Sequence, residues 1–337
     1  MSAAIINPKY STDQIDLKDP PKDGISSLNF SSHNPDLLLV TSWDNSVRIY
    51  NVTANTIVSK YEHAKSVLSG CFSVNDQYCF SGDLEGKLMK YNLKTGDASL
   101  VGQVSDFHRS AIRCVSVVPN QPNWVITGSW DNTLKLWDIS KNTCLQTLDL
   151  EKKVYCMDVT PDGTKLLVGT QDLLVFVVAL RQDPQRSPLK ITTRQNTGLK
   201  HQTRCIKCFR DSNSFAIGSL EGRIAVKHIQ QADMQNNYAF KCHRTKTAQQ
   251  VETLYPVNTI ATHPKYEIFA TGGCDGTIAL WDRMNKKKLN STSPFETSIS
   301  AISFNCTGNY LAFAVSYTWE MGNQSHPSDR ICIKKLV

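Results

Sequence analysis

The sequence predicts an all-β fold, a seven-bladed β-propeller in which four-stranded sheets close into a ring. The phrase TSWDNSVRIYNV at residues 41–52 returns as GSWDNTLKLWDI at residues 128–139. Related phrases recur at intervals of 41 to 54 residues, and an alternating run typical of a strand lies upstream of each. One such sheet cannot bury both of its faces, but seven packed radially can.

Each copy consists of an inner strand, a middle strand, a tight turn and a third strand. The inner strands include ISSLNF (25–30), AIRCVSVV (111–118), TRCIKCF (203–209) and VNTIATH (257–263). The remaining phrases are CFSGDLEGKLMKYNL (79–93), LVGTQDLLVFVVAL (167–180), AIGSLEGRIAVKHI (216–229) and ATGGCDGTIALWDR (270–283). The seventh copy is SISAISFNCTGNYLAFAVSY (298–317), with RICIKKL (330–336) as its last strand.

An acidic residue occupies the tight turn of six copies. These residues are Asp44, Glu85, Asp131, Asp172, Glu221 and Asp275. A carboxylate there can accept hydrogen bonds from backbone N–H groups or from a histidine in the preceding loop. Glycine follows three of the acids, as in Glu221-Gly222, and supplies the positive φ that such turns need. The acids are therefore interpreted as structural and not as catalytic carboxylates.

The predicted propeller covers residues 25–337, preceded by an N-terminal segment at 1–24. The seventh blade lacks an outermost strand, and YSTDQIDL (10–17) could return to supply it and remove an open sheet edge. Between the fourth and fifth copies, residues 181–200 contain two prolines and extra basic residues, and we expect a loop.

Composition excludes several classes of protein. Among the 337 residues there is no run of 18 apolar residues and no secretory signal, so no membrane partner is expected. The net charge of +7 favours acidic partners but lacks the dense basic tract of a nucleic-acid binder. Eleven cysteines without a signal peptide indicate free thiols in a reducing compartment.

No motif for catalysis, cofactor binding or metal binding is found. The chain has no Gly-rich phosphate loop, Gly-x-Ser-x-Gly elbow or His-Glu-x-x-His helix, so neither an enzyme nor a cofactor is predicted. Cys205 and Cys208 could form half of a zinc site. Residues three apart on a strand face opposite sides, however, and buried structural cysteines are the favoured interpretation.

Two tryptophans stand out because the repeat does not require them. Trp43 and Trp130 precede the turn acid where other copies have Leu84, Gln171, Leu220 or Cys274. At this position we expect them on one rim of the ring, largely exposed. They either pack against a neighbouring blade or act as aromatic anchors for a partner peptide.

A basic group forms the second candidate site. Arg223 follows the turn glycine of blade five, and Lys241, His243 and Arg244 cluster in YAFKCHR (238–244). We expect these residues near each other on the same rim, where they could bind phosphate or carboxylate. The lysines at 286–288 are interpreted as a solvated face.

The repeat resembles the WD40 family over nearly the whole chain. The matching features are the Trp-Asp pairs at 137–138 and 281–282, the Pro-Asp-Gly turn at 161–163, and the histidines that open several units, His63, His108 and His201. Seven copies at this period are specific, although only two end in a literal Trp-Asp.

A denser match points to one WD40 subfamily. The stretches DGISSLNFS, TSWDNSVRIYNV, VTGSWDNTLKLWD, QTRCIK, SLEGRIAV, YAFKCHR, YPVNTI and SYTWEM resemble the spindle-assembly-checkpoint adaptors, the third protein of the Bub (budding uninhibited by benzimidazole) group. The sister subfamily, the messenger-RNA-export and nuclear-pore propellers, shares GSWD, EGR and FKCHR, and export remains the alternative function.

The resemblance implies a non-enzymatic adaptor with two peptide ligands, found in the nucleus and at kinetochores in mitosis. A GLEBS-type segment of a Bub-family checkpoint kinase or pseudokinase would contact Trp43, Trp130 and Arg204. The phosphothreonine of Met-Glu-Leu-Thr repeats in the kinetochore scaffold would contact Arg223 and Lys241, with His243 and Arg244 as secondary basic candidates. The mitotic checkpoint complex is a further implied partner.

Overall fold

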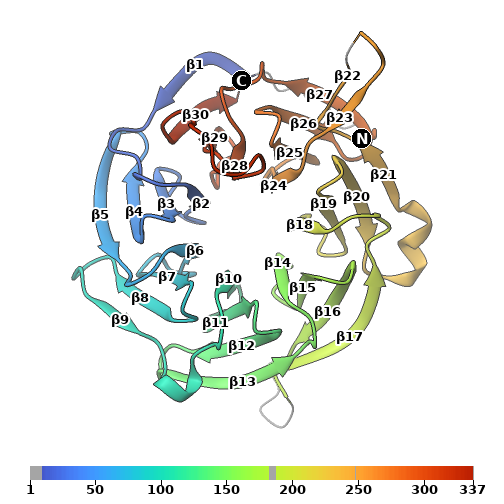
Figure 1. Ribbon diagram of the computed structural model, residues 1–337. Coiled ribbons are helices and arrows are strands. Elements are labelled where there is room, and N and C mark those ends of the chain that lie inside the picture. The colour runs from blue at the N-terminus through green and yellow to red at the C-terminus, as the bar shows by residue number, and fades with distance from the viewer. Residues whose placement is uncertain (1–9, 182–186, 247, 337) are drawn as a thin grey trace.

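A computed structural model describes residues 10–181, 187–246 and 248–336, and these form seven four-stranded antiparallel sheets around a central axis (Figure 1). Each sheet is one blade. Strands β2, β6, β10, β14, β18, β24 and β28 lie nearest the axis (Figure 1). The predicted all-β, seven-bladed propeller is confirmed.

Blades one to four are continuous in sequence. Blade one contains β2 (Ile25–Phe30), β3 (Leu37–Ser42), β4 (Ser46–Asn51) and β5 (Thr56–Glu62). Blade two contains β6 (Val67–Phe72), β7 (Tyr78–Asp83), β8 (Leu88–Asn92) and β9 (Ala98–Leu100), followed by the short 3-10 helix η1 (Val104–Asp106). Blade three contains β10 (Ile112–Val118), β11 (Gln121–Ser129), β12 (Thr133–Asp138) and β13 (Thr143–Asp149). Blade four contains β14 (Val154–Val159), β15 (Lys165–Thr170), β16 (Leu174–Leu180) and β17 (Leu189–Asn196).

An additional hairpin lies between blades five and six, and blade seven includes one strand from the N-terminal segment. Blade five contains β18 (Thr203–Cys208), β19 (Ser214–Ser219), β20 (Arg223–His228) and β21 (Tyr238–Lys241), with η2 (Gln231–Asn236) before β21. A two-stranded hairpin, β22 (Arg244–Lys246) and β23 (Glu252–Leu254), precedes blade six. Blade six contains β24 (Val257–Thr262), β25 (Ile268–Gly273), β26 (Ile278–Asp282) and β27 (Lys287–Ser291). Blade seven contains β28 (Ile299–Phe304), β29 (Tyr310–Val315), β30 (Arg330–Leu336) and β1 (Tyr10–Asp16).

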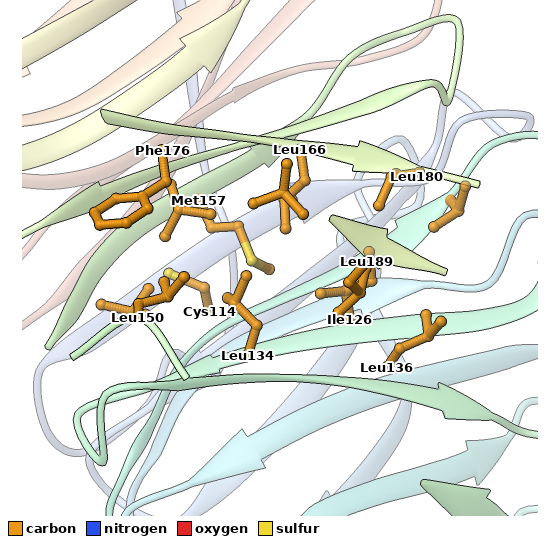
Figure 2. Packing of buried hydrophobic residues seen from close by; sticks show 14 residues of the cluster. Cys114, Ile126, Leu134, Leu136, Leu150, Met157, Leu166, Phe176, Leu180 and Leu189 are labelled. Atoms are coloured by element: carbon orange, nitrogen blue, oxygen red, sulfur yellow. The ribbon is translucent and has the colours of Figure 1, made fainter. Parts of the chain in front are cut away.

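Apolar side chains between neighbouring blades form the core. In Figure 2, Ile126, Leu134 and Leu136 of blade three face Leu166 and Phe176 of blade four. Each of these side chains is 2% exposed or less. A buried Leu or Phe contributes roughly 1.5–3 kcal/mol by leaving water. Packing of blade against blade therefore stabilises the ring, as expected for sheets that cannot bury both faces alone.

Hydrogen-bonded side chains tie the tight turns to the blades. In blade three the indole N–H of Trp137 donates to Thr127 (2.9 Å), the Thr127 hydroxyl contacts Nε2 of His108 (2.7 Å), and Nδ1 of His108 contacts Asp131 (2.9 Å). Burial lowers the pKa of His108 although Asp131 acts in the opposite direction. A neutral histidine can accept from threonine and donate to aspartate, so the chain of bonds is complete.

The same four-residue arrangement recurs in blade six, with a histidine that the sequence had suggested for another role. Trp281, Thr271, His243 and Asp275 are linked in that order at 3.0, 2.8 and 2.9 Å. His201, expected to open blade five in this way, is exposed.

The turn acid of blade two was wrongly assigned to Glu85. Asp83 accepts the backbone N–H groups of Glu85 (3.0 Å) and Lys87 (2.9 Å) and contacts His63 (3.1 Å). Glu85 instead pairs with the side chain of Lys87 at the surface. Asp83 ends β7 and Glu85 lies in the turn that follows, only two residues on, so the sequence pattern alone did not separate them.

Strand β1 pairs antiparallel with β30 at the outer edge of blade seven, with Ile15 opposite Ile333. Leu17, just after β1, is buried, and its N–H donates to the carbonyl of Ile331 (2.8 Å). Arg330 contacts Asp16 (3.2 Å) beside the same junction. The paired strand leaves β30 inside the sheet instead of at its edge. Residues 1–9 of the N-terminal segment lie outside the described residues.

The expected loop at 181–200 is wrong for residues 189–196. Residues 189–196 form β17, the outer strand of blade four, paired with β16. An outer strand packs on few neighbours, and this one exposes Lys190, Thr193 and Arg194, so its polar composition resembled a loop. Residues 182–186 lie outside the described ranges.

Among the described residues, no helix has both the length and the apolar character to cross a membrane.

Candidate functional site

Each inner strand carries a β-bulge near its beginning. In the described blades the pairing of first and second strands skips one residue, in the order Ser26, Leu68, Arg113, Tyr155, Arg204, Asn258 and Ser300. A bulge re-aims a side chain out of the regular alternation of a strand. We call these seven residues the bulge ring, because the innermost strands surround the axis (Figure 1).

Six members of the bulge ring line one cavity of about 550 Å³, at the end of the central channel where the bulges lie. We call this cavity the mouth pocket. Trp43, Trp130 and Arg204 line it together, as do Arg113 and Trp319. A second cavity of about 330 Å³ continues between the inner strands and is also lined by Arg113 and Arg204. The structure thus brings together three residues that lie far apart in the sequence.

The backbone N–H and the backbone carbonyl of Trp43 both form hydrogen bonds. Its N–H donates to the carbonyl of Gly24 (2.9 Å), and the Ser66 hydroxyl donates to its carbonyl (2.8 Å). A Cβ at Gly24 would lie 3.3 Å from the indole ring, so glycine lets the ring approach the chain closely. The Trp43 side chain remains 43% exposed, as expected for an anchor.

The carboxylate of Asp44 fixes the turn that carries Trp43. It accepts the backbone N–H groups of Ser46 (3.0 Å) and Lys22 (3.0 Å) and pairs with Arg48 (3.0 Å). Burial opposes ionisation of this carboxyl, but its hydrogen bonds and Arg48 outweigh burial and lower the pKa of Asp44 to about 2. The Asp44 carboxylate therefore stays ionised, and able to accept these hydrogen bonds, down to acidic pH.

Trp130 is less exposed than predicted. It is half-buried, and its N–H donates to the carbonyl of Ala111 (3.1 Å). Its indole Nε1 is buried and has no hydrogen-bond partner among the described residues. The expectation of a largely exposed side chain holds for Trp43 only, because Trp130 also packs into the wall of the mouth pocket.

Trp319 is a wall of the mouth pocket that sequence reasoning did not assign. It is 53% exposed and has a φ of 59°, a left-handed conformation that is unusual for a bulky residue. Tyr317 and His326 lie 6.0 and 6.2 Å from its ring. The available signal was a tryptophan in the long connection between the second and third strands of blade seven, the connection that carries Trp43 and Trp130 in other blades.

Arg204 was found only through family resemblance, since TRCIKC looked like an ordinary strand. Its bulge position explains why the side chain lines the mouth pocket. The second position of each inner strand is thus the signal that was missed. The neighbouring Cys205 and Cys208 are half-buried and buried free thiols, and burial raises the pKa of Cys205 to about 12.

Arg223 and Lys241 face each other across β20 and β21, and we call this pair the basic rim. Each has an acid nearby: Arg223 Nε lies 3.7 Å from Glu221, and Lys241 Nζ lies 4.0 Å from Glu252. The Lys241 side chain is 57% exposed. Residues 154–291, which include the rim, hold 19 Lys and Arg against 11 Asp and Glu, whereas the rest of the chain holds 18 against 19.

The two secondary basic candidates are not surface groups. His243 is buried with both ring nitrogens engaged by Asp275 and Thr271, as described above. Arg244 donates to the backbone carbonyls of Gly222 (3.2 Å) and Glu221 (2.8 Å) and to Glu252 (3.1 Å). His243 therefore belongs to the bonded side chains of blade six, whereas Arg244 holds the backbone of the turn that precedes Arg223.

Comparisons with known proteins agree with this architecture. The family model described as "WD domain, G-beta repeat" matches residues 15–51, 102–138 and 240–282. "Mitotic checkpoint protein bub3" of Dictyostelium discoideum is 41% identical over 325 residues, covering 96% of this chain and 94% of the relative. The chain belongs to the WD40 repeat family.

Within the WD40 family, relatives of this chain include proteins named for the mitotic checkpoint and proteins named for mRNA export. "Mitotic checkpoint protein BUB3.1" of Arabidopsis thaliana is 39% identical, covering 95% of this chain and 92% of the relative. "mRNA export factor GLE2" of Chaetomium thermophilum is 35% identical, covering 94% of this chain and 87% of the relative. The predicted resemblance to the checkpoint WD40 proteins, with the export factors as a sister group, is confirmed.

Proposed function

We propose that this protein is a mitotic spindle-checkpoint adaptor without catalytic activity of its own. Its mouth pocket would bind the GLEBS-type segment of a Bub-family checkpoint kinase or pseudokinase. Its basic rim would bind phosphorylated Met-Glu-Leu-Thr repeats of the kinetochore scaffold. In this role it recruits the kinase to kinetochores in mitosis, contributes to the mitotic checkpoint complex, and is nuclear otherwise.

The observation that carries the proposal is the mouth pocket, in which Trp43, Trp130 and Arg204 converge. Two partly exposed indoles beside an arginine suit a peptide with an apolar side chain next to a glutamate. Relatives of 36–41% identity that are named mitotic checkpoint proteins support a checkpoint role for this chain.

The basic rim lies on the same face as the mouth pocket. Trp43 and Trp130 sit in the turn between the second and third strands of their blades, and Arg223 directly follows that turn in blade five. Because the blades repeat around the axis, equivalent turns share one face of the ring (Figure 1). A phosphothreonine adds a charge of about −1.5 to −2 and three acceptor oxygens, which suits an arginine beside a lysine.

Two sites on one rigid face explain how an adaptor can work without chemistry. Occupying the mouth pocket holds a tethered kinase close to the scaffold, so that later encounters take place at high effective concentration. Phosphorylation of the scaffold is the switch, because it supplies the charge that the basic rim binds.

Titration calorimetry tests the proposal directly. Protein saturated with a GLEBS-type peptide is titrated with Met-Glu-Leu-Thr peptides that carry or lack the phosphate. We expect binding of the phosphorylated peptide alone, weakened roughly tenfold to a hundredfold by Arg223→Ala. Lys287→Ala, an exposed lysine of blade six, is the matched control and should change nothing. Equal binding of both peptides, or of neither, would contradict the rim assignment.

An export function is the second candidate, favoured by two relatives named for export, at 35% and 36% identity. An export factor of this kind would bind a GLEBS-type segment of a nucleoporin in the same mouth pocket. It should show no preference for phosphorylated Met-Glu-Leu-Thr peptides. Retention of the GLEBS-type peptide without phosphopeptide binding would therefore favour export.

A further inference from the structure

The two sides of the mouth pocket differ in charge. Arg113 and Arg204 line it from blades three and five, whereas Asp23, just before blade one, lines it together with Trp43. In Figure 1 the inner strands β2 and β28 of blades one and seven lie across the axis from β14 of blade four, which separates the two arginine-bearing strands. A ligand in the pocket therefore meets basic side chains on one side and an acidic one on the other.

The carboxylate of Asp23 has no cationic partner among the described residues. The side chain is exposed, and one of its oxygens accepts the N–H of Gly24 (2.7 Å), but no lysine, arginine or histidine forms an ion pair with it. The backbone carbonyl of Asp23 accepts the hydroxyl of Ser42 (2.9 Å), directly before Trp43. The backbone of Asp23 is thus held beside the Trp43 turn, while its negative charge remains available to a ligand.

Two partly exposed indoles lie next to this carboxylate. Trp43 and Trp319 are 43% and 53% exposed, and both line the mouth pocket with Asp23. A Cβ at Gly24 would lie 3.3 Å from the ring of Trp43 and 3.9 Å from the carbonyl of Tyr317, so both segments approach the glycine that follows Asp23. The face of an indole attracts a cation through its negative potential. A carboxylate beside two indoles suits an ammonium or guanidinium group.

Trp319 belongs to the blade-seven connection, residues 316–329, which contains no lysine or arginine. Glu320 of this connection accepts the hydroxyl of Thr318 (2.7 Å) and that of Ser298 in the loop before blade seven. These bonds on both sides of Trp319 tie the connection to the blade. The indole is therefore positioned before a ligand arrives, with no basic side chain of its own segment to compete for its face.

A buried carboxylate adds to the negative charge on this side of the pocket. Asp329 is 6% exposed, and one of its oxygens is buried without a hydrogen-bond partner among the described residues. Burial raises the pKa of Asp329 and the charge of Asp23 acts in the same direction, whereas Ser316 and His326 oppose them. The two acids are thus close enough to disfavour each other's ionisation. A cation bound at Asp23 would relieve that repulsion.

We propose that Asp23, Trp43 and Trp319 form a cation subsite of the mouth pocket, which takes a lysine or arginine side chain of the bound peptide. This inference rests on the proposed function of the mouth pocket and adds a basic residue to the ligand. Because the subsite lies across the axis from Arg113 and Arg204, the order of acidic and basic residues in the peptide decides the direction in which it crosses the mouth.

The test is a mutant cycle between the full chain and a GLEBS-type peptide from a Bub-family kinase. Each lysine and arginine of the peptide is changed to glutamine, one at a time. Calorimetry measures how every peptide binds to the wild type and to Asp23→Asn, which keeps an oxygen for the Gly24 N–H and removes only the charge. We expect Asp23→Asn to weaken the native peptide about threefold to tenfold. One basic position should matter to the wild type and not to Asp23→Asn.

Trp319→Ala should reduce the effect of the same basic position. Asp149→Asn is the control, because Asp149 is exposed, accepts the N–H of Glu151 (2.7 Å) in a similar way and does not line the mouth pocket. It should leave the binding of every peptide unchanged. If Asp23→Asn binds as tightly as the wild type, or weakens all peptides equally, the inference is wrong and the proposed function stands. A wild-type protein that binds no GLEBS-type peptide would overturn both.

Discussion

The mouth pocket and the basic rim lie on one face of the ring, but they differ in whether their basic side chains have acidic partners. In the mouth pocket, Arg113 and Arg204 have no acidic partner among the described residues, and exposed indole surface lies beside them. At the basic rim, Arg223 and Lys241 each lie within 4.0 Å of a glutamate. The arginines of the mouth pocket thus lack negative charge beside them, whereas the charges of the basic rim are largely balanced.

This difference indicates when each surface can bind. Unpaired arginines and exposed tryptophans can take up an acidic, apolar segment at any time. A balanced rim gains little from a single carboxylate, because its own glutamates already supply that charge. A phosphate brings about twice the charge and more acceptors, so it can compete. The mouth pocket therefore suits a constitutive partner and the rim suits a regulated one.

The largest expected effect is the loss of an indole from the mouth pocket. Trp43→Ala should weaken the GLEBS-type peptide about a hundredfold, because buried aromatic anchors dominate peptide interfaces. Phosphopeptide binding and the melting temperature should be unchanged, since this side chain is 43% exposed. Calorimetry and thermal melts measure both, with Val104→Ala as an exposed apolar control on η1. Equal weakening of both peptides would show that the two surfaces are not independent.

Trp319 gives a smaller test of the same pocket. Trp319→Ala should weaken the GLEBS-type peptide about tenfold, because one wall of the pocket is lost while two indoles remain. Met321→Ala is the matched control, since Met321 is 74% exposed and does not line the pocket. Peptide binding that is the same for the wild type and Trp319→Ala would remove Trp319 from the site.

Glu252 offers a way to break the charge balance of the rim. Glu252→Gln keeps an oxygen for Arg244 but removes the charge beside Lys241. Phosphopeptide affinity should rise about threefold, a change typical of one exposed ion pair. Glu62→Gln removes the same charge from an exposed site on blade one and should have no effect. An unchanged or lowered affinity would mean that Glu252 does not oppose ligand binding.

The smallest expected effect is a difference between the two peptides in how their affinity changes from pH 7.5 to pH 5.5. Phosphopeptide affinity should fall about twofold to threefold, because the phosphate loses its second charge near pH 6. The GLEBS-type peptide should bind equally, because the Trp43 turn depends on Asp44. The folded pKa of that carboxyl, about 2, lies below the usual 3.8, so its contribution to stability is full above pH 3.8 and is lost as the pH falls towards 2. Parallel loss of both peptides would contradict this reasoning.

The inner strands and tight turns of the blades could be predicted from local sequence patterns. The inner strand β2 has the bounds expected for ISSLNF, and β30 has those expected for RICIKKL. In β2 buried and less buried positions follow one another apart from the bulge, and in β30 three consecutive apolar residues are buried. The outer strand β17 was missed because most of its residues are exposed or only partly buried and its sequence is largely polar.

The candidate site was only partly predictable for the same reason. Trp43, Trp130, Arg223 and Lys241 were singled out because the repeat does not require them at their positions. His243 was misjudged, since YAFKCHR does not reveal that its histidine reaches Asp275, 32 residues away. Arg113, Arg204 and Trp319 were not singled out from the residues alone, because a bulge or a long connection decides where their side chains point.

The number of blades, the inner strands and the turns that carry Trp43, Trp130 and Arg223 could thus be predicted from the amino-acid sequence, because these features depend on neighbours along the chain. Which side chains share a pocket depends instead on how the blades close into a ring. Closing the ring brings the bulges of separate blades around one axis and sets glutamates of one loop against lysines of another. Burial and charge pairing at the site depend on these contacts between distant segments, which no single stretch of sequence contains.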